Sequence, residues 1–109
     1  MDFEIGGKPY CIEFTIGRIL LYERAARMPL MATFVKNGGA FGIDELATLA
    51  GYGMKAEGGK FVKPDKGKEK AMRLIETNGY PAVFERVAEA LQRDCGFLFE
   101  TSEGTEPTQ

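Results

Sequence analysis

The residue types that most often carry enzyme chemistry are sparse in this chain. It has no histidine, and its only serine is Ser102. Histidine acid–base catalysis and Ser–His or Cys–His nucleophile pairs are therefore excluded. Cys11 and Cys95 lie too far apart in sequence for a CxxC pair, and two cysteines make no disulfide framework. We interpret both as free thiols in a reducing compartment, with a single Cys11–Cys95 bridge as the alternative.

Two carboxylate pairs, Asp44/Glu45 and Glu85/Glu89, could in principle serve acid–base catalysis or hold a metal ion. Both pairs fall on the polar faces of predicted helices, and acidic residues in a first helical turn favour the helix dipole. The glycine-rich stretch 51–60 fails as a phosphate loop, because Gly59 stands where the motif needs lysine. The sequence thus predicts a non-enzymatic protein without a catalytic, cofactor or metal site.

Length and charge narrow the class further. The 109 residues match one domain, and the net charge is −2 with 14 basic and 16 acidic residues. A general nucleic-acid binder needs an excess of lysine and arginine, so nucleic acid is an unfavoured partner. No apolar run reaches the ~18 residues of a membrane span, and the opening MDFEIGG is unlike a signal peptide. We expect no membrane contact and a cytoplasmic location.

Residues 1–14 alternate between apolar and polar side chains around Gly6-Gly7, which predicts a β-hairpin. Apolar residues are odd-numbered before the turn and even-numbered after it. They share one face only if the loop has an even number of residues. A two-residue turn pairs Ile5 with Lys8 and Phe3 with Tyr10, and it places Pro9 opposite Glu4.

Helical spacing of apolar residues dominates the rest of the chain. Thr15 can cap the first helix, whose wide apolar arc predicts that it is well buried. Residues 56–66 are expected to form a surface loop. The predicted helices cover residues 16–28, 29–36, 43–55, 67–78 and 81–95. The fold class is therefore α+β, an N-terminal β-hairpin followed by a bundle of four to five helices, as one domain over 1–99 with a disordered polar tail over 100–109.

Two segments are candidates for protein binding. Phe97, Leu98 and Phe99 follow the last helix as an apolar patch for self-association or for a client, or else they fold back onto the core. Phe41 and Phe61, isolated in loops beside glycines, raise the same question more weakly. Six lysines stand against three acids within 55–70, and Lys55, Lys60 and Lys63 could dock an acidic partner. The alternative is a solvated loop.

The opening FEIGGKPYCIEFTIGRILLYER, residues 3–24, resembles the N-terminus of phage tail assembly chaperones of the long non-contractile tail type. In that family a strand, an I-N-G-K-x-Y-type turn and a second strand lead into a helix with an L-x-x-L/Y-E-like pattern. Gly6 stands here where asparagine is commoner. The later order is also similar, from Ala50-Gly51-Tyr52-Gly53 through a variable loop to Glu89-Ala90-Leu91.

The resemblance implies a small cytoplasmic adaptor that self-associates, in the host cytoplasm if a phage encodes the chain. Such an adaptor holds the tape measure protein in solution and helps recruit tail tube subunits during virion assembly. A longer frameshifted product would diverge after Phe99. Two other functions remain open. The chain could be a virion component, such as a head–tail connector or tail-terminator subunit, whose hairpin extends a neighbour's sheet. It could also be a small nucleic-acid-binding regulator that uses the lysines of 55–70.

Overall fold

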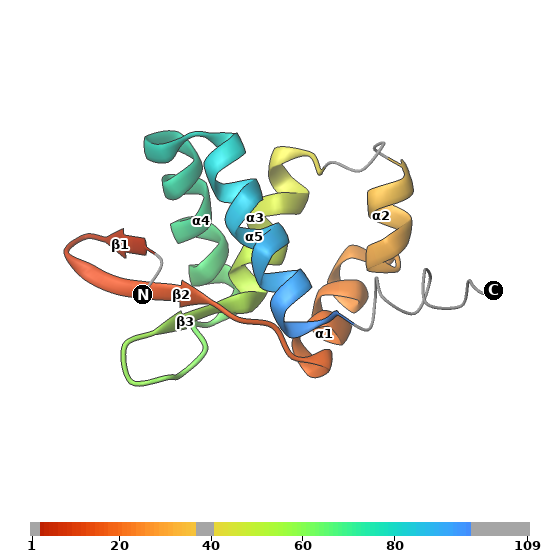
Figure 1. The fold of residues 1–109 in the computed structure, drawn as a ribbon, viewed down its shortest axis with the longest axis horizontal. Coiled ribbons are helices and arrows are strands. Elements are labelled where there is room, and N and C mark those ends of the chain that lie inside the picture. The colour runs from red at the N-terminus through yellow and green to blue at the C-terminus, as the bar shows by residue number, and fades with distance from the viewer. Residues whose placement is uncertain (1–2, 37–40, 97–109) are drawn as a thin grey trace.

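The computed structural model describes residues 3–36 and 41–96. Within them a small antiparallel sheet stands beside five helices, so the predicted α+β class is confirmed (Figure 1). In chain order the elements are β1 (Phe3–Ile5), β2 (Lys8–Ile12), α1 (Ile16–Ala26), α2 (Leu30–Lys36), α3 (Ile43–Gly53), β3 (Met54–Ala56), α4 (Pro64–Asn78) and α5 (Tyr80–Asp94).

The N-terminal hairpin has the register that the sequence predicts. Phe3 pairs with Tyr10, Glu4 with Pro9 and Ile5 with Lys8. Gly6 and Gly7 both adopt positive φ angles, which a two-residue turn of this kind requires. Alternation then places Tyr10, Ile12 and Ile5 on the buried face of the sheet.

A third strand was not predicted. Residues 54–56, which the sequence analysis divided between a helix end and a loop, form β3 and pair antiparallel with β2. The strand follows α3 without a turn, and Gly53 O accepts a hydrogen bond from the Glu13 amide at 2.8 Å. The sheet order is therefore β1-β2-β3, with β2 in the centre. Helix α4 also begins three residues earlier than predicted, because Pro64 occupies the first helical turn, where proline is favoured.

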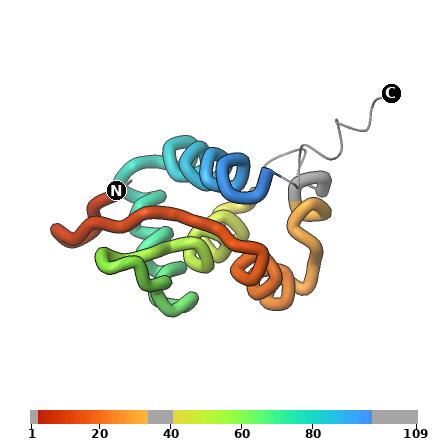
Figure 2. Tube along the Cα trace, turned by 60° about the horizontal axis from the view of Figure 1, so that its bottom comes forward, coloured from red at the N-terminus to blue at the C-terminus, as the bar shows by residue number. Residues whose placement is uncertain are grey.

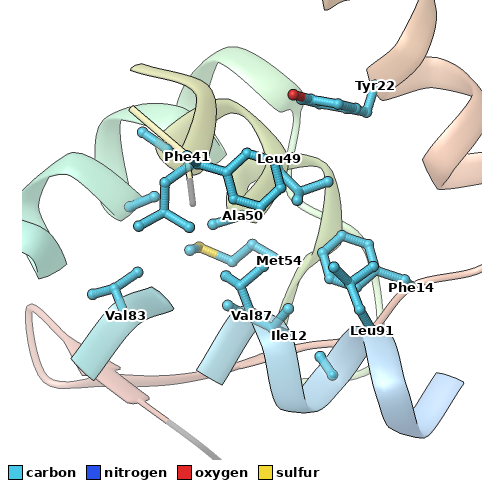
Figure 3. Packing of buried hydrophobic residues seen from close by; sticks show 14 of the residues in the cluster. Ile12, Phe14, Tyr22, Phe41, Leu49, Ala50, Met54, Val83, Val87 and Leu91 are labelled. Atoms are coloured by element: carbon cyan, nitrogen blue, oxygen red, sulfur yellow. The ribbon is translucent and has the colours of Figure 1, made fainter. Parts of the chain in front are cut away.

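The core is centred on α3. Its Leu46, Ala47, Leu49 and Ala50 are fully buried, and they pack against α4, α5 and the sheet. Figure 3 shows Val83, Val87 and Leu91 of α5 facing Met54 and Ile12 across this core.

Two glycines allow the closest helix contact. A Cβ added to Gly51 would lie 2.7 Å from the backbone nitrogen of Lys68, and one added to Gly67 would lie 2.6 Å from the carbonyl oxygen of Gly51. Helix α3 continues to Gly53, close to the predicted end at residue 55, because Gly51 and Gly53 serve packing rather than termination.

Helices α1 and α2 lie at one end of this core, to which they contribute Ile19, Tyr22 and Leu30. They lie at the opposite end of the molecule from the β1–β2 turn (Figures 1 and 2). Asp94 joins the end of α5 to the start of this region, since its Oδ2 accepts the Phe14 amide hydrogen at 2.9 Å. Arg93 adds a second link, with Nη2 donating to Ile12 O at 2.7 Å.

Candidate functional site

Local interactions define where α1 begins and ends. Thr15 Oγ1 accepts the Arg18 amide hydrogen at 3.1 Å, as the sequence predicts for an N-cap. Arg27 ends the helix in the left-handed region, with φ at 58°. Glu23 Oε2 then accepts the Leu30 amide hydrogen at 2.7 Å. That contact fixes the corner between α1 and α2.

The prediction that this first helix is well buried is wrong. Only Ile19 and Tyr22 of α1 are buried. Ile16 is 64% exposed, Leu20 46% and Leu21 39%. The wide apolar arc is real, but the core of this chain covers only one side of it. The other side presents apolar side chains to solvent, which marks a contact surface when such residues are contiguous.

We call this surface the outer α1 face, defined as Ile16, Gly17, Leu20 and Leu21. Ile16 and Leu20 are one helical turn apart, so they are neighbours on the helix surface. Gly17 carries no side chain, which leaves the centre of the face low. Exposed basic residues, Arg24 and Arg27, continue the same side of the helix. The face thus offers an apolar strip with a positive end.

A second set of exposed apolar residues lies on α3 and α4. Ile43 and Met72 are both exposed and, with Ile75, line a hollow of about 640 Å³. Charged residues of α4 surround it: Glu69, Arg73 and Glu76. An apolar floor with a charged rim is a common form of protein-binding surface.

Two of the predicted binding residues take part in contacts within the chain. The Lys55 ammonium pairs with Glu13 Oε1 at 3.1 Å and lies 5.2 Å from the centre of the Phe61 ring. The Arg18 guanidinium lies 4.3 Å from the same ring centre. Phe61 is therefore half-buried between two cations, an arrangement that stabilises the loop after β3. A role of either residue in partner binding stays a prediction.

The other lysines of 55–70 do not form one patch. Lys60 and Lys63 are exposed, as a docking role needs. Lys68 pairs with Asp44 of α3, and the Lys70 ammonium lies 5.2 Å from the ring centre of Tyr10. The positive charge seen in the sequence is thus spread over several sides of the fold.

The apolar segment Phe97, Leu98 and Phe99 lies outside the described residues, as does the predicted tail over 100–109. The preceding Cys95 is fully buried, and this burial raises the pKa of its thiol. Cys11 and Cys95 are both free thiols. Phe41 is buried rather than exposed, since it contacts Phe84, and its carbonyl oxygen accepts a hydrogen bond from Tyr80.

The two carboxylate pairs have different surroundings. Glu85 and Glu89 are exposed on α5. Asp44 and Glu45 line a cleft of about 600 Å³ between α1, α2, α3 and α4. Glu45 Oε1 also accepts the Gly42 amide hydrogen at 2.9 Å, and this contact starts α3. The cleft further includes Asp65 and Lys68, so three carboxylates stand against one ammonium.

Tyr22 forms part of this cleft and was not singled out by its position in the sequence. Its side chain is fully buried, yet its hydroxyl has no hydrogen-bond partner among residues 3–36 and 41–96. Such a group costs about 1–3 kcal/mol. Burial raises the pKa of Tyr22, the nearby Thr33 hydroxyl lowers it in part, and the negative charges of Glu45 and Asp44 raise it further. The hydroxyl is thus neutral and lies in a negative potential.

Arg18 is the other polar group that sequence reasoning missed. Its Nε donates to Tyr52 O at 2.6 Å, while its buried Nη2 has no hydrogen-bond partner in the described part of the chain. Burial lowers the pKa of this guanidinium. A tyrosine or arginine within an apolar helix face is itself a signal, because its polar end needs a partner once the helix packs.

Among the described residues, no group of three or more histidine, cysteine, aspartate or glutamate side chains could hold a metal ion. In the same residues, none of the helices has the length and apolar character to cross a membrane. Comparison of the chain with protein-family models, with curated proteins and with solved structures found no match.

Proposed function

We propose that this protein is a non-enzymatic phage or prophage tail assembly chaperone, which binds the tape measure protein and helps recruit tail tube subunits. The observation that carries the proposal is the outer α1 face, where Ile16, Leu20 and Leu21 are exposed although they belong to an otherwise well-formed helix. A protein that holds a client in solution needs such apolar surface on a folded domain. The resemblance of residues 3–24 to tail assembly chaperones supports the same function.

The geometry suits an amphipathic helix as the client. Ile16 and Leu20 form a strip along α1, which matches the i, i+4 apolar spacing of a helix laid against it. Arg24 and Arg27 beside the strip favour acidic residues at the corresponding end of the client. The hollow beside Ile43 and Met72 offers a second apolar contact, for a longer client or for a second copy of this chain.

Co-expression tests the proposal. The tape measure protein of the same phage is produced alone and together with this chain, and its soluble fraction is measured. We expect the tape measure protein to stay soluble and to co-elute with this chain in size exclusion. A tape measure protein that stays insoluble in both cases, or that elutes separately, would overturn the proposal.

One observation favours the second candidate, a virion structural component. Strand β1 stands at the edge of the sheet, and within the described residues only β2 pairs with it. An open edge can accept a strand from a neighbouring subunit. Mass spectrometry of purified particles separates the two functions, because a structural component is present in them and a chaperone is absent.

A further inference from the structure

The outer α1 face begins close to the end of α5. Asp94 Oδ2 accepts the Phe14 amide hydrogen at 2.9 Å, which holds the last turn of α5 beside the start of α1 (Figure 1). Ile16 is two residues from Phe14, and Gly96 is two residues from Asp94. Two residues span at most about 7 Å. The chain therefore continues past Gly96 from a point close to the first residue of the outer α1 face.

The apolar residues 97–99 follow directly in the sequence. The core at this point needs no further cover, because Leu91 and Cys95 are fully buried and Phe14 is 2% exposed. Three extended residues reach about 10 Å. Ile16 is exposed at this end of α1, so it is the first large apolar side chain that these residues can cover.

The hollow beside Ile43 lies at the opposite end of α5. Phe41, two residues before Ile43, accepts a hydrogen bond from Tyr80, the first residue of that helix. From Tyr80 to Asp94 the helix rises about 21 Å. Residues 97–99 of the same chain can therefore reach the outer α1 face but not the hollow.

The spacing of the apolar segment matches that of the face. Alternate side chains of an extended segment point the same way and lie about 7 Å apart, so Phe97 and Phe99 would share one side. Ile16 and Leu20 are four residues apart on α1, which is about 6 Å along the helix. Two phenyl rings can thus cover both exposed side chains at once.

The charges that follow are complementary. Residues 100–109 include three glutamates and no lysine or arginine. On α1 the apolar strip is followed by Arg24 and Arg27, which are exposed and form no ion pair within residues 3–36 and 41–96. Arg27 lies about 17 Å along α1 from the start of the strip. In an extended segment Glu103 follows the first phenylalanine by about 20 Å, and the two long side chains can bridge the difference.

We propose that the outer α1 face is the docking site of the chain's own C-terminal segment, 97–109. The two phenylalanines pack on Ile16 and Leu20, and Glu103 pairs with Arg27. The docked segment covers the surface that the client would use, so the segment and the client compete for it. This competition rests on the proposed function, whereas the docking itself does not.

The test is an NMR study of the full chain without a client. We expect nuclear Overhauser effects between the ring protons of Phe97 or Phe99 and the methyl groups of Ile16 and Leu20. A mixture of isotope-labelled and unlabelled chains separates contacts within one chain from contacts between two chains. The proposal is overturned if these effects are absent, which means a free face, or arise only between chains, which means that a second copy is the occupant.

Two variants locate the docking. Glu103→Lys should weaken the ring-to-methyl effects at least about 2-fold, because an attractive surface pair becomes a repulsive one. The matched control Glu89→Lys, on the exposed side of α5, should leave them unchanged. Phe97→Ser/Phe99→Ser should shift the amide resonance of Leu20 and leave the chain folded. A double variant that fails to fold would place both rings in the core, and equal effects of the two lysine variants would remove the charge pairing; either result contradicts the proposal.

Client binding separates this inference from the proposed function. Phe97→Ser/Phe99→Ser should raise the apparent affinity for the tape measure protein about 3-fold to 10-fold, because a larger fraction of the chain then has a free face. Ring contacts without any binding of the tape measure protein would leave the docking in place and refute the proposed function. Binding without ring contacts would do the reverse. Weaker binding by the double variant would show that the two rings contact the client, which contradicts competition.

Discussion

The contact between α3 and α4 and the outer α1 face are made from similar amino acids but have opposite roles. Between α3 and α4, Gly51 and Gly67 let the two backbones meet so closely that no side chain fits. On α1, Gly17 stands among exposed apolar residues, and a Cβ there would meet only Thr15 Oγ1 at 3.7 Å. The contact between α3 and α4 uses its small residues for packing within the fold, whereas the outer α1 face exposes its apolar residues to solvent.

This difference shows that the width of an apolar arc indicates how much surface a helix can bury. It does not indicate how much of that surface the rest of the same chain covers. Ile19 and Tyr22 are the buried residues of α1, and Arg18 Nε donates a hydrogen bond to Tyr52 O of α3. Ile16, Leu20 and Leu21 are exposed. Their retention outside the core is what the proposed client-binding function explains.

The largest expected contrast comes from leucine truncation in the two regions. Leu91→Ala opens a cavity in the fully buried core and should lower the free energy of unfolding by about 2–5 kcal/mol. Leu20→Ala on the outer α1 face should change it by less than about 0.5 kcal/mol. Urea unfolding of both variants gives the comparison. A similar loss in both would mean that Leu20 belongs to the core in solution.

Glycine-to-alanine substitution should give opposite signs in the two regions. Gly51→Ala places a methyl group against the backbone of Lys68 and should destabilise the fold by about 1–3 kcal/mol. Gly17→Ala meets no close atom and should stabilise it by about 0.5–1 kcal/mol, because alanine favours the helix. Thermal unfolding measures both. Stabilisation by Gly51→Ala would contradict the close approach of α3 and α4.

Asp94 links the core to the start of α1, and its contribution should depend on pH. The hydrogen bond from Arg93 lowers the pKa of Asp94 below its usual 3.8, as does the one from the Phe14 amide, while burial opposes them. The unfolded chain therefore takes up the proton first as the pH falls. Stabilisation is complete above the unfolded pKa and is lost as the pH falls through the lower folded pKa.

The variant Asp94→Asn should lose about 1–3 kcal/mol at pH 7, as expected for a hydrogen-bonded charged group. Its difference from the natural chain should shrink as the pH falls below 3.8. Urea unfolding at pH 7 and pH 3 checks this, with Glu89→Gln as the exposed control on the same helix. A difference that is the same at both pH values would show that the Asp94 charge contributes nothing.

The smallest expected effect concerns Phe61. Phe61→Leu keeps an apolar side chain but removes the ring that contacts Arg18 and Lys55, and it should cost about 0.5–1 kcal/mol. Thermal unfolding with Phe61→Tyr, which keeps the ring, separates the ring contact from burial. If Phe61→Leu leaves stability intact but weakens client binding, Phe61 acts in recognition, as its sequence context predicts.

Much of the fold could be predicted because local rules decide it. The parity of apolar residues around Gly6-Gly7 determines the hairpin register, and Thr15 marks the start of the first helix through capping. Strand β3 could not be predicted, since Met54, Lys55 and Ala56 form a strand only because β2 lies beside them. The packing role of Gly51 and Gly53 could not be predicted for a related reason. Their role depends on Lys68 and Phe14, which the chain brings close only after folding.

The candidate site was predictable only in part. Lys60 and Lys63 are exposed, as their polar surroundings in the sequence indicate. Lys55 and Phe61 contact other residues of the same chain, which spacing alone does not reveal. The outer α1 face was visible as an apolar arc, but periodicity cannot tell an arc that faces a core from one that faces a partner.

The central claim is that the outer α1 face binds a client and does not support the fold. The most direct test is the double variant Ile16→Ser/Leu20→Ser, measured both by urea unfolding and by co-purification with the tape measure protein. We predict a free energy of unfolding within about 1 kcal/mol of the natural chain and loss of the co-purified client. A variant that unfolds readily, or one that retains the client in full, would contradict the account.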